Sequence, residues 1–335
     1  MTITDIAEKA GVSIATVSRF LNNGPVKEET KKKLEQVLLE MNYIPEKDQR
    51  RNITNQNTKE AIAVITHSLS NFYTSEFAEE VANRYAAEGS MCYTICCTNI
   101  EEEYRSLMDM MSRNFTGAIL HDLAEGEARV ELYNRISQRL PLVVVHSYPA
   151  DLECNSITVN QEKGMKDAMT YLVNQGHKSI AYVSGENGYS FKMKEKIWKE
   201  ELEKIGCTPK KQDAIKVEKS DFEAGIETAY DAVLKYLQDG NRPDAIFTAN
   251  DIMALGTIAA LSDAGLKVGE DISLMSHDNT ILSRSYSLTC VDMKIRSVAI
   301  AAVDLMNYAL HGSDSTPRHV TISPAILERN SVRKL

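Results

Sequence analysis

Several features are missing from this sequence, and each absence excludes a class of protein. No stretch approaches the roughly 20 consecutive apolar residues of a bilayer-spanning helix, so we expect no membrane association. The start, Met1 to Asp5, lacks a basic segment followed by an apolar run, so we see no export signal and expect a cytoplasmic location. The six cysteines lack zinc-like spacing and are expected to be reduced packing residues.

Signatures of catalysis are absent as well. The chain has no nucleophile elbow, no Walker loop and no glycine fingerprint for a dinucleotide. No acid and base pair for hydrolysis is evident in the sequence. We therefore expect that the protein is not an enzyme and that it uses no cofactor and no metal.

The charge is distributed unevenly along the 335 residues, a length that suits two or three domains. The net charge of −9 argues against a protein that coats nucleic acid with its whole surface. Residues 1–60 carry ten basic and nine acidic side chains, whereas the remainder carries ten more acidic than basic ones. This shift suggests a separate module at the front of the chain.

Three short helices are predicted within residues 1–45. Their inward positions, at i, i+3 and i+4 spacing, are Ile6, Ala7 and Ala10, then Val17, Phe20 and Leu21, then Leu34, Val37, Leu38 and Met41. Thr4 is expected to cap the first helix and Ser13 the second. A short turn containing Gly11 joins them, as in a helix-turn-helix, although a plain three-helix bundle would share this pattern.

The outward face of the second helix distinguishes these two readings. It carries Ile14, Ala15, Ser18, Arg19 and Asn22. Arginine can bond guanine with two hydrogen bonds, isoleucine and alanine can contact thymine methyl groups, and hydroxyl or amide side chains can hold phosphates. This face therefore predicts DNA binding in the major groove.

The run from Thr4 to Asn22 resembles the head of the LacI/GalR (lac repressor) family, whose pattern is roughly D-[IV]-A-x-x-A-G-V-S-x-x-T-V-S-R-x-L-N. The resemblance implies that Ile14 and Ala15 are the variable base-reading pair and that Arg19 is the common base contact. The DNA-binding set that we predict is Thr4, Ser13, Ile14, Ala15, Thr16, Ser18, Arg19, Asn22, Arg50 and Arg51.

Two positions depart from the family pattern. Val26 stands where the family places a serine that caps the third helix, and losing such a cap costs about 1 kcal/mol. Asn52 stands where the family's hinge helix carries a leucine that wedges into the minor groove, and the neighbouring Ile53 would project about 100° away. Arg50 and Arg51 then either bind phosphates or belong to a plain solvated linker.

Beyond residue 60, short apolar runs alternate with helical patterns, which predicts parallel sheets with helices on both faces. The expected strands are Ala61–Ile65, Tyr93–Cys97, Ala118–Leu120, Leu142–Val145, Ile157–Val159, Ile180–Val183, Ala245–Thr248 and Ile272–Met275. The expected helices include Ser75–Glu88, Glu101–Arg113, Lys163–Asn174, Ala224–Leu237, Ile252–Ala264 and Ile295–Leu310.

The resemblance continues through residues 174–185, 242–256 and 271–279, and the family's sensor is similar to periplasmic sugar-binding proteins. It implies an all-α helix-turn-helix head followed by an α/β sensor of two lobes, with two parallel sheets and three crossovers. The expected parts are a head at 1–45, a hinge at 46–60 and a sensor at 61–335, with a first lobe at about 61–158 and 292–315 and a second at about 159–291 and 316–333.

An effector cleft between the lobes is implied by the same resemblance. Its residues would be His67, Phe72, His146, Lys194, Phe222, Asn250 and Asp278. Amide and carboxylate groups bond vicinal hydroxyls and aromatic faces stack on sugar rings, so we expect a sugar, with a sugar phosphate as the second choice. Asn250 could instead cap the helix that follows it. Lys194 replaces a frequent arginine, His146 a frequent aspartate and His277 a usual aromatic residue, so the pocket is remodelled.

These features together predict a transcription repressor whose affinity for operator DNA is controlled by a small-molecule effector bound between two lobes. Its partners would be double-stranded operator DNA, the effector and a second copy in a homodimer. The alternative is a sugar or sugar-phosphate sensor without strong operator binding of its own. A free-standing exported sugar-binding protein would need an export signal and would not need the head.

Overall fold

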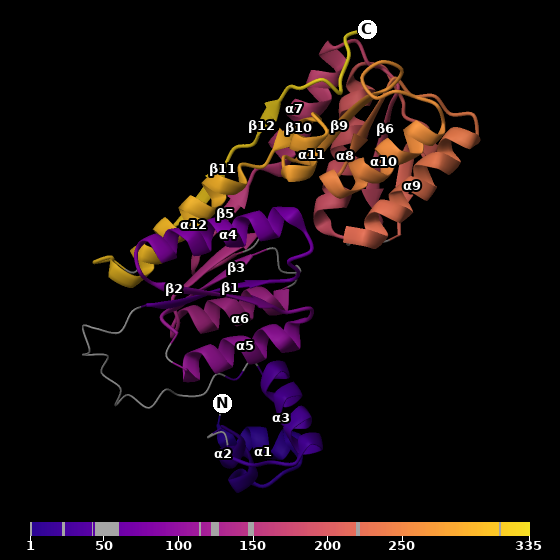
Figure 1. The fold of residues 1–335 in the computed structure, drawn as a ribbon. Helices are drawn as coiled ribbons and strands as arrows, with labels where there is room; N and C mark the ends of the chain where they lie inside the picture. The colour runs from indigo at the N-terminus through magenta and orange to yellow at the C-terminus, as the bar shows by residue number, and fades with distance from the viewer. Residues whose placement is uncertain are drawn as a thin grey trace.

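The computed structural model describes residues 2–21, 24–41, 43, 60–113, 115–121, 127–146, 151–218, 222–314 and 316–335. The molecule has three parts along its length: a helical head that carries the N-terminus, a first α/β lobe, and a second α/β lobe that carries the C-terminus (Figure 1). The expected class, a helix-turn-helix head followed by a two-lobed α/β sensor with two sheets, is confirmed.

The head is built from the three predicted helices, α1 (Ile3–Ala10), α2 (Ile14–Leu21) and α3 (Glu28–Glu40). Its core contains the predicted positions: Ile6, Ala10, Val17 and Leu34 are fully buried. Phe20, Leu21 and Met41 are half-buried and pack against this core. Burial of one apolar face per helix thus explains why these short helices pack together.

The start of α1 differs from the expectation for Thr4. Thr4 lies exposed inside the helix, and Thr2 is the capping residue. The hydroxyl of Thr2 accepts a hydrogen bond from the Asp5 backbone N–H at 3.3 Å, and the Asp5 carboxylate accepts one from the Thr2 N–H at 2.7 Å. The predicted cap at Thr4 is wrong because the residue three positions on, Ala7, cannot return such a bond.

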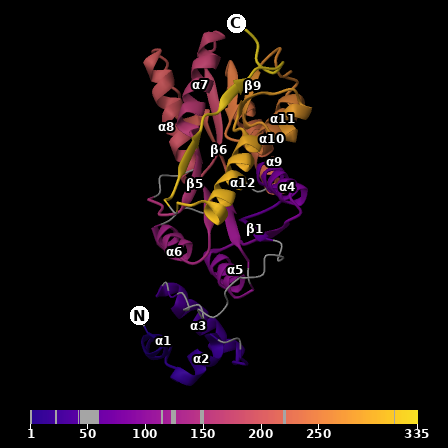
Figure 2. The same cartoon turned by 90° about the vertical axis from the view of Figure 1, so that its left-hand side faces the viewer.

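The first lobe contains a six-stranded sheet in the order β11-β5-β4-β3-β1-β2, with every neighbouring pair parallel. Its strands are β1 (Ala61–Thr66), β2 (Met91–Cys96), β3 (Gly117–His121), β4 (Leu142–His146), β5 (Asn155–Val159) and β11 (His319–Ile322). Helices α4 (Phe72–Ala87) and α12 (Ile295–His311) lie against one face of the sheet. Helices α5 (Ile100–Ser112) and α6 (Glu127–Ser137) cover the other (Figure 2).

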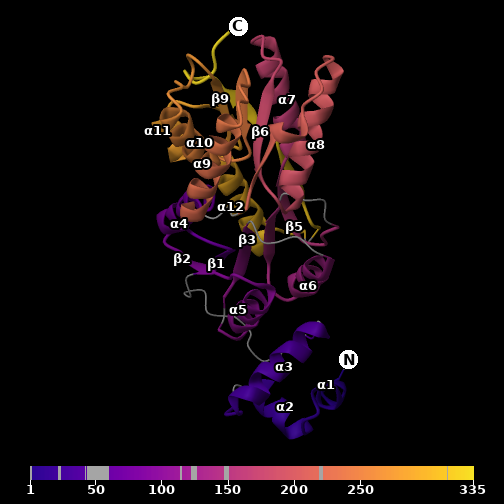
Figure 3. The same cartoon turned by 90° about the vertical axis from the view of Figure 1, so that its right-hand side faces the viewer.

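The second lobe contains a six-stranded sheet in the order β12-β10-β9-β8-β6-β7, in which only the β10–β12 pair is antiparallel. Its strands are β6 (Ile180–Gly185), β7 (Ala214–Val217), β8 (Ala245–Thr248), β9 (Ser273–Asp278), β10 (Thr289–Asp292) and β12 (Ala325–Leu327). Helices α7 (Gln161–Asn174) and α8 (Tyr189–Lys204) lie on one side, and α9 (Phe222–Gln238) and α10 (Asp251–Asp263) on the other (Figure 3). A short helix, α11 (Ile281–Ser285), follows β9.

Three connections cross between the lobes: β5 to α7, β10 to α12, and β11 to β12. The last one lies farther along the chain than expected, since β11 belongs to the first sheet. Its register pairs Val320 with Ile157 and Ile322 with Val159. Residues 319–322 therefore belong to the first lobe and not to the second, because they pair with β5 in the parallel ladder at this sheet edge.

The head rests against the first lobe of its own chain. The Tyr104 hydroxyl on α5 donates to the Tyr43 carbonyl at 2.5 Å, and the Arg105 guanidinium pairs with the Glu35 carboxylate of α3 at 2.7 Å. Arg135 of α6 donates to the carbonyl of Met41, the residue after α3, at 3.4 Å. These contacts fix α3 under α5 and leave α2 facing away from the lobes (Figure 2).

Candidate functional site

The turn between α1 and α2 aims the second helix outward. Gly11 has a φ of +61°, in the left-handed region that glycine adopts without steric cost, and its N–H donates to the Glu8 carbonyl at 3.1 Å. The hydroxyl of Ser13 accepts from the Thr16 backbone N–H at 3.2 Å. The predicted cap of the second helix at Ser13 is therefore confirmed.

The solvent face of α2 carries the residues predicted to read bases. Ile14 is 52% exposed, and Ala15 and Arg19 are exposed beside it. Thr16 and Ser18 are half-buried at the edges of this face. An exposed isoleucine next to an arginine gains nothing from the head's own core, so this face is suited to contact another molecule.

Some predicted DNA contacts cannot be placed. Asn22, Arg50 and Arg51 lie outside the described residues, as does Asn52 of the expected hinge. Thr4 is exposed on α1, one helix away from the face of α2.

A second group of functional residues lies where parallel strands end. Ligands of α/β sheets bind beyond the carboxyl ends of the strands, because helix starts and loops converge there. Four of the seven histidines occupy such positions: His67 directly after β1, His121 and His146 as the last residues of β3 and β4, and His277 near the end of β9. The strand ends of both lobes are thus rich in imidazole.

Lys194 brings the second lobe's part of this group together. It lies on α8 with only 4% of its surface exposed. Its ammonium group donates to the Ala249 carbonyl at 3.1 Å and lies 3.4 Å from Nδ1 of His277. The same Nδ1 is 2.9 Å from the Asp278 carboxylate. The predicted residues Lys194 and Asp278 therefore meet, with His277 between them.

The carboxyl groups of Asp278 and Asp251 in this cluster have raised pKa values. Burial raises the pKa of Asp278 above its usual value, while the Lys194 ammonium group beside it opposes the rise. Burial also raises the pKa of Asp251 to about 6, against hydrogen bonds from Ser276 and Thr280 that favour its charged form. Asp278 and Asn279 have φ values of +115° and +65°, and such backbone costs on the order of 1–3 kcal/mol per residue.

The other predicted effector residues have different positions. The Asn250 amide oxygen accepts from the Met253 N–H at 2.9 Å, so Asn250 caps α10. His67 is exposed, and Phe72 lines a separate cavity between the lobes. The backbones of His146 and Phe222 end β4 and begin α9, and their side chains lie outside the described part of the structure.

Sequence reasoning missed several buried polar groups at the strand ends. Both ring nitrogens of His121, the hydroxyls of Thr66 and Thr248, and Nε2 of His277 have no hydrogen-bond partner within the described structure. Thr66 and His121 are register neighbours on β1 and β3. The signal that could have revealed them is a polar residue closing an apolar strand pattern, since buried polar groups are rarely left unpaired.

An aromatic wall accompanies these groups. The ring of His121 stacks on Phe77 at 4.0 Å between centroids and lies 5.5 Å from Tyr73, both on α4. Burial lowers the pKa of His121 to about 3, and burial also lowers that of His277 far below its usual value. The imidazoles are therefore neutral at pH 7, and each can offer one donor and one acceptor. This set is suited to bind a small polar molecule.

Among the residues that the structure describes, no group of three or more His, Cys, Asp or Glu could hold a metal ion. No helix among the described segments is both long and apolar enough to cross a membrane. All six cysteines are free thiols.

Two family models match the chain. Residues 2–46 match the bacterial regulatory proteins of the lacI family, and residues 169–332 match a periplasmic binding protein-like domain. These segments correspond to the helical head and to most of the second lobe with α12.

Similar proteins agree over the whole length. The catabolite control protein A of Priestia megaterium is 31% identical over 91% of this chain and 91% of that protein. The transcriptional repressor PurR of Vibrio atlanticus is 31% identical over 100% of this chain and 99% of that protein. A structure of the lac repressor bound to ONPG superimposes with a TM-score of 0.71 and 25% identity, covering 99% of both chains.

Proposed function

The chain belongs to the lacI family of bacterial regulatory proteins, and from that premise we propose how it reads DNA and what controls it. It is a DNA-binding transcription regulator with an effector-binding body. In our proposal it acts as a repressor in the cytoplasm, and α2 enters the major groove of an operator. The single observation that carries this proposal is the solvent-facing surface of Ile14, Ala15 and Arg19.

The roles on α2 follow from the chemistry of each side chain. Arg19 donates two hydrogen bonds to a guanine, and Ile14 with Ala15 contacts thymine methyl groups. The hydroxyls of Ser13, Thr16 and Ser18 hold phosphates, which fix the register of the helix but carry no sequence information. The remaining phosphate contacts that we propose come from Thr4, Asn22, Arg50 and Arg51.

A selection of genomic fragments tests this reading. The full chain is used to enrich fragments, and the enriched sequence is compared with a shuffled copy in a gel shift at fixed salt. We expect two related half-sites and at least about a thousandfold preference over the shuffled copy, as specific regulators show. Equal affinity for both sequences, at low and at physiological salt, would contradict operator recognition.

We further propose that the effector is a sugar bound between the strand ends of the two lobes. Lys194, Asn250 and Asp278, with His67 and His146, would bond its hydroxyls. The rings of Phe72 and Phe222 would stack on the sugar ring. The buried cluster of Lys194, His277 and Asp278 supports this, because it offers donors and acceptors in a site largely removed from water. We assign no catalytic step to these residues.

A thermal-shift panel of neutral sugars and sugar phosphates identifies the effector class. We expect one neutral sugar to raise the Tm of the wild-type chain and to lose that effect in Asp278→Asn. A shift produced only by phosphorylated compounds would replace the neutral sugar by a sugar phosphate. A panel without any shift would contradict both.

A homodimer completes the proposal, since two heads related by symmetry fit two half-sites. A solved structure of the lac repressor is a dimer bound to its operator. Sedimentation equilibrium at micromolar concentration should give twice the mass of the chain, and a pure monomer would count against the dimer.

A further inference from the structure

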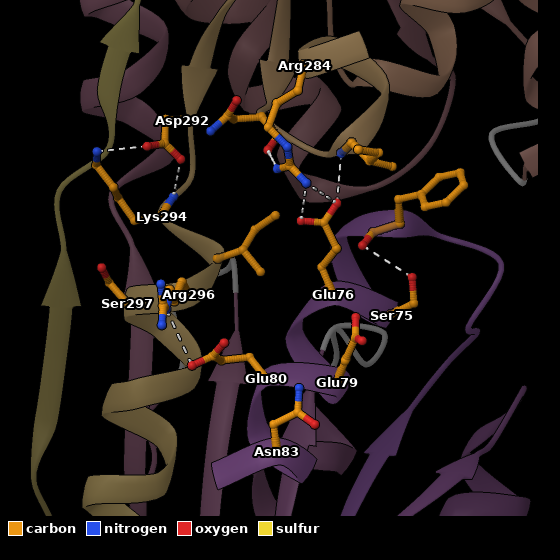
Figure 4. A pocket seen from close by; sticks show the side chains of 14 residues that line it. Ser75, Glu76, Glu79, Glu80, Asn83, Arg284, Asp292, Lys294, Arg296 and Ser297 are labelled. Carbon is orange, nitrogen blue, oxygen red and sulfur yellow. Dashed lines mark hydrogen bonds and ion pairs between the residues drawn. The ribbon is translucent and has the colours of Figure 1, made fainter.

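One side chain of the first lobe reaches across to the second lobe. Glu76 lies on α4, and one oxygen of its carboxylate accepts a hydrogen bond from the Ile281 backbone N–H of α11 at 2.7 Å. The Arg284 guanidinium lies 3.1 and 3.0 Å from the two carboxylate oxygens. Figure 4 shows these three bonds converging on Glu76 from the opposite side of a cavity.

The environment of this contact is polar and open. The cavity beside it has a volume of about 730 Å³ and is lined by α4 on one side and by α11, β10 and the start of α12 on the other. Glu79 and Glu80 of α4 line the same cavity. Glu80 pairs at 3.5 Å with Arg296 on α12, which packs within the first lobe. Among the described residues of α4 that line this wall, Glu76 is thus the acidic residue that bonds groups of the second lobe.

The second lobe connects this contact to the effector site through adjacent residues. Arg284 also donates to the Asn279 carbonyl at 2.7 Å. Asn279 directly follows Asp278, and both have positive φ values, which are uncommon for residues other than glycine. Asp278 faces His277 within the buried cluster. A change at Asp278 can therefore move the Asn279 carbonyl, and with it one of the groups that orient Arg284.

We propose that Glu76, Ile281 and Arg284 form an interlobe latch that holds the lobes in this arrangement. Glu76 and Arg284 are 24% and 41% exposed, so the ion pair is partly screened and its contribution is modest. A modest contribution is sufficient, because small free-energy differences shift the populations of open and closed lobes. A ligand on Asp278 then alters the latch through Asn279; that last step alone rests on the proposed function.

The latch is tested in the full chain with neither DNA nor effector present. Glu76→Ala removes all three bonds, and Arg284→Ala removes the ion pair but leaves the bond from Ile281. Glu79→Ala is the matched control, since it removes the same charge from the same wall of the cavity. The double variant Glu76→Arg with Arg284→Glu restores an ion pair of opposite polarity. Circular dichroism establishes that each variant is folded.

The readouts are hydrogen exchange of the segment 279–285 and the radius of gyration from small-angle scattering. We expect exchange at least about fivefold faster and a larger radius in Glu76→Ala, a smaller effect in Arg284→Ala, and wild-type values in Glu79→Ala. The double variant should recover part of the protection.

Equal behaviour of Glu76→Ala and Glu79→Ala would overturn the latch, as would a double variant no more protected than Glu76→Ala. Because the experiment contains no operator, failure of the latch leaves the DNA-reading role of α2 standing. A chain that fails the gel shift can still show the latch.

Discussion

Arg19 lies exposed on α2, and we expect it to contribute to the free energy of DNA binding. Arg19→Ala should lower affinity for the selected operator about tenfold to a hundredfold, the range of about 1–3 kcal/mol for a bidentate contact to guanine. Fluorescence anisotropy with labelled operator measures the change. Arg113→Ala is the control, because Arg113 is 73% exposed at the end of α5 and pairs only at 3.9 Å with Asp109 of the same helix. Equal losses in both variants would remove Arg19 from the interface.

The buried His121 makes the stability of the folded chain depend on pH. Its pKa falls from 6.5 to about 3 because burial disfavours the charged ring, so the unfolded chain binds a proton below pH 6.5 that the native chain does not. Because His121 has a lowered pKa, its contribution to the free energy of unfolding is fully present above pH 6.5. This contribution is lost as the pH falls toward 3. The loss reaches up to about 1.4 kcal/mol per pH unit.

Urea unfolding at pH 7.5 and pH 5 measures this effect. His121→Gln does not titrate, so the free energy of unfolding of the wild type should fall relative to this variant at pH 5. His67→Gln is the control, since His67 is exposed near the same strand ends. A constant difference between wild type and His121→Gln at both pH values would show that His121 is not held neutral.

The site residues were predictable only in part, and particular residues show why. Asp278 lies within the motif at residues 271–279, which places it at a strand end, whereas Lys194 was predicted only from its position in the family. The structure brings the two together through His277. His121 was missed because a histidine after an apolar run reads equally well as a surface residue. Its burial depends on Phe77 and Tyr73, which come from a helix more than 40 residues earlier.

At the scale of elements, the contact between α3 and α5 positions the head. The double variant Tyr104→Phe with Arg105→Ala removes the bonds to the Tyr43 carbonyl and to Glu35. Each such bond contributes about 0.5–1.5 kcal/mol, so the head should separate more often from the first lobe. Nitrogen-15 relaxation should then show α1 and α2 tumbling faster than the body. Tumbling unchanged from the wild type would mean that these bonds do not hold the head.

Most elements followed from periodicity, and the exceptions have physical reasons. The strands β7, β10 and β11 were not predicted because polar residues interrupt their short apolar runs, unlike the equally short β8, and β12 has three residues. β11 was assigned to the wrong lobe because its partner, β5, lies more than 150 residues earlier. Thr2 was overlooked as a cap because Thr4 stands closer to the apolar face of α1.

At the scale of the whole molecule, the family pattern predicted the head, the two lobes and their parallel sheets. It could not predict the interlobe latch, because Glu76 and Arg284 are separated by 208 residues and meet only through the relative placement of the lobes. The expected hinge with Asn52 lies outside the described residues, so its role on DNA remains a prediction. The latch joins the second lobe to the first, and the contact between α3 and α5 joins the first lobe to the head, so the two are successive links between the second lobe and the head.

We propose that a ligand bound to the body controls operator binding, and one titration measures this control. Anisotropy of the selected operator is measured with the full chain, with and without a saturating amount of the sugar found by thermal shift. We expect at least a fivefold change in operator affinity, within the usual range of allosteric coupling. The same change must be absent when Asp278→Asn replaces the wild type. An operator affinity that no body-binding ligand alters would contradict the account.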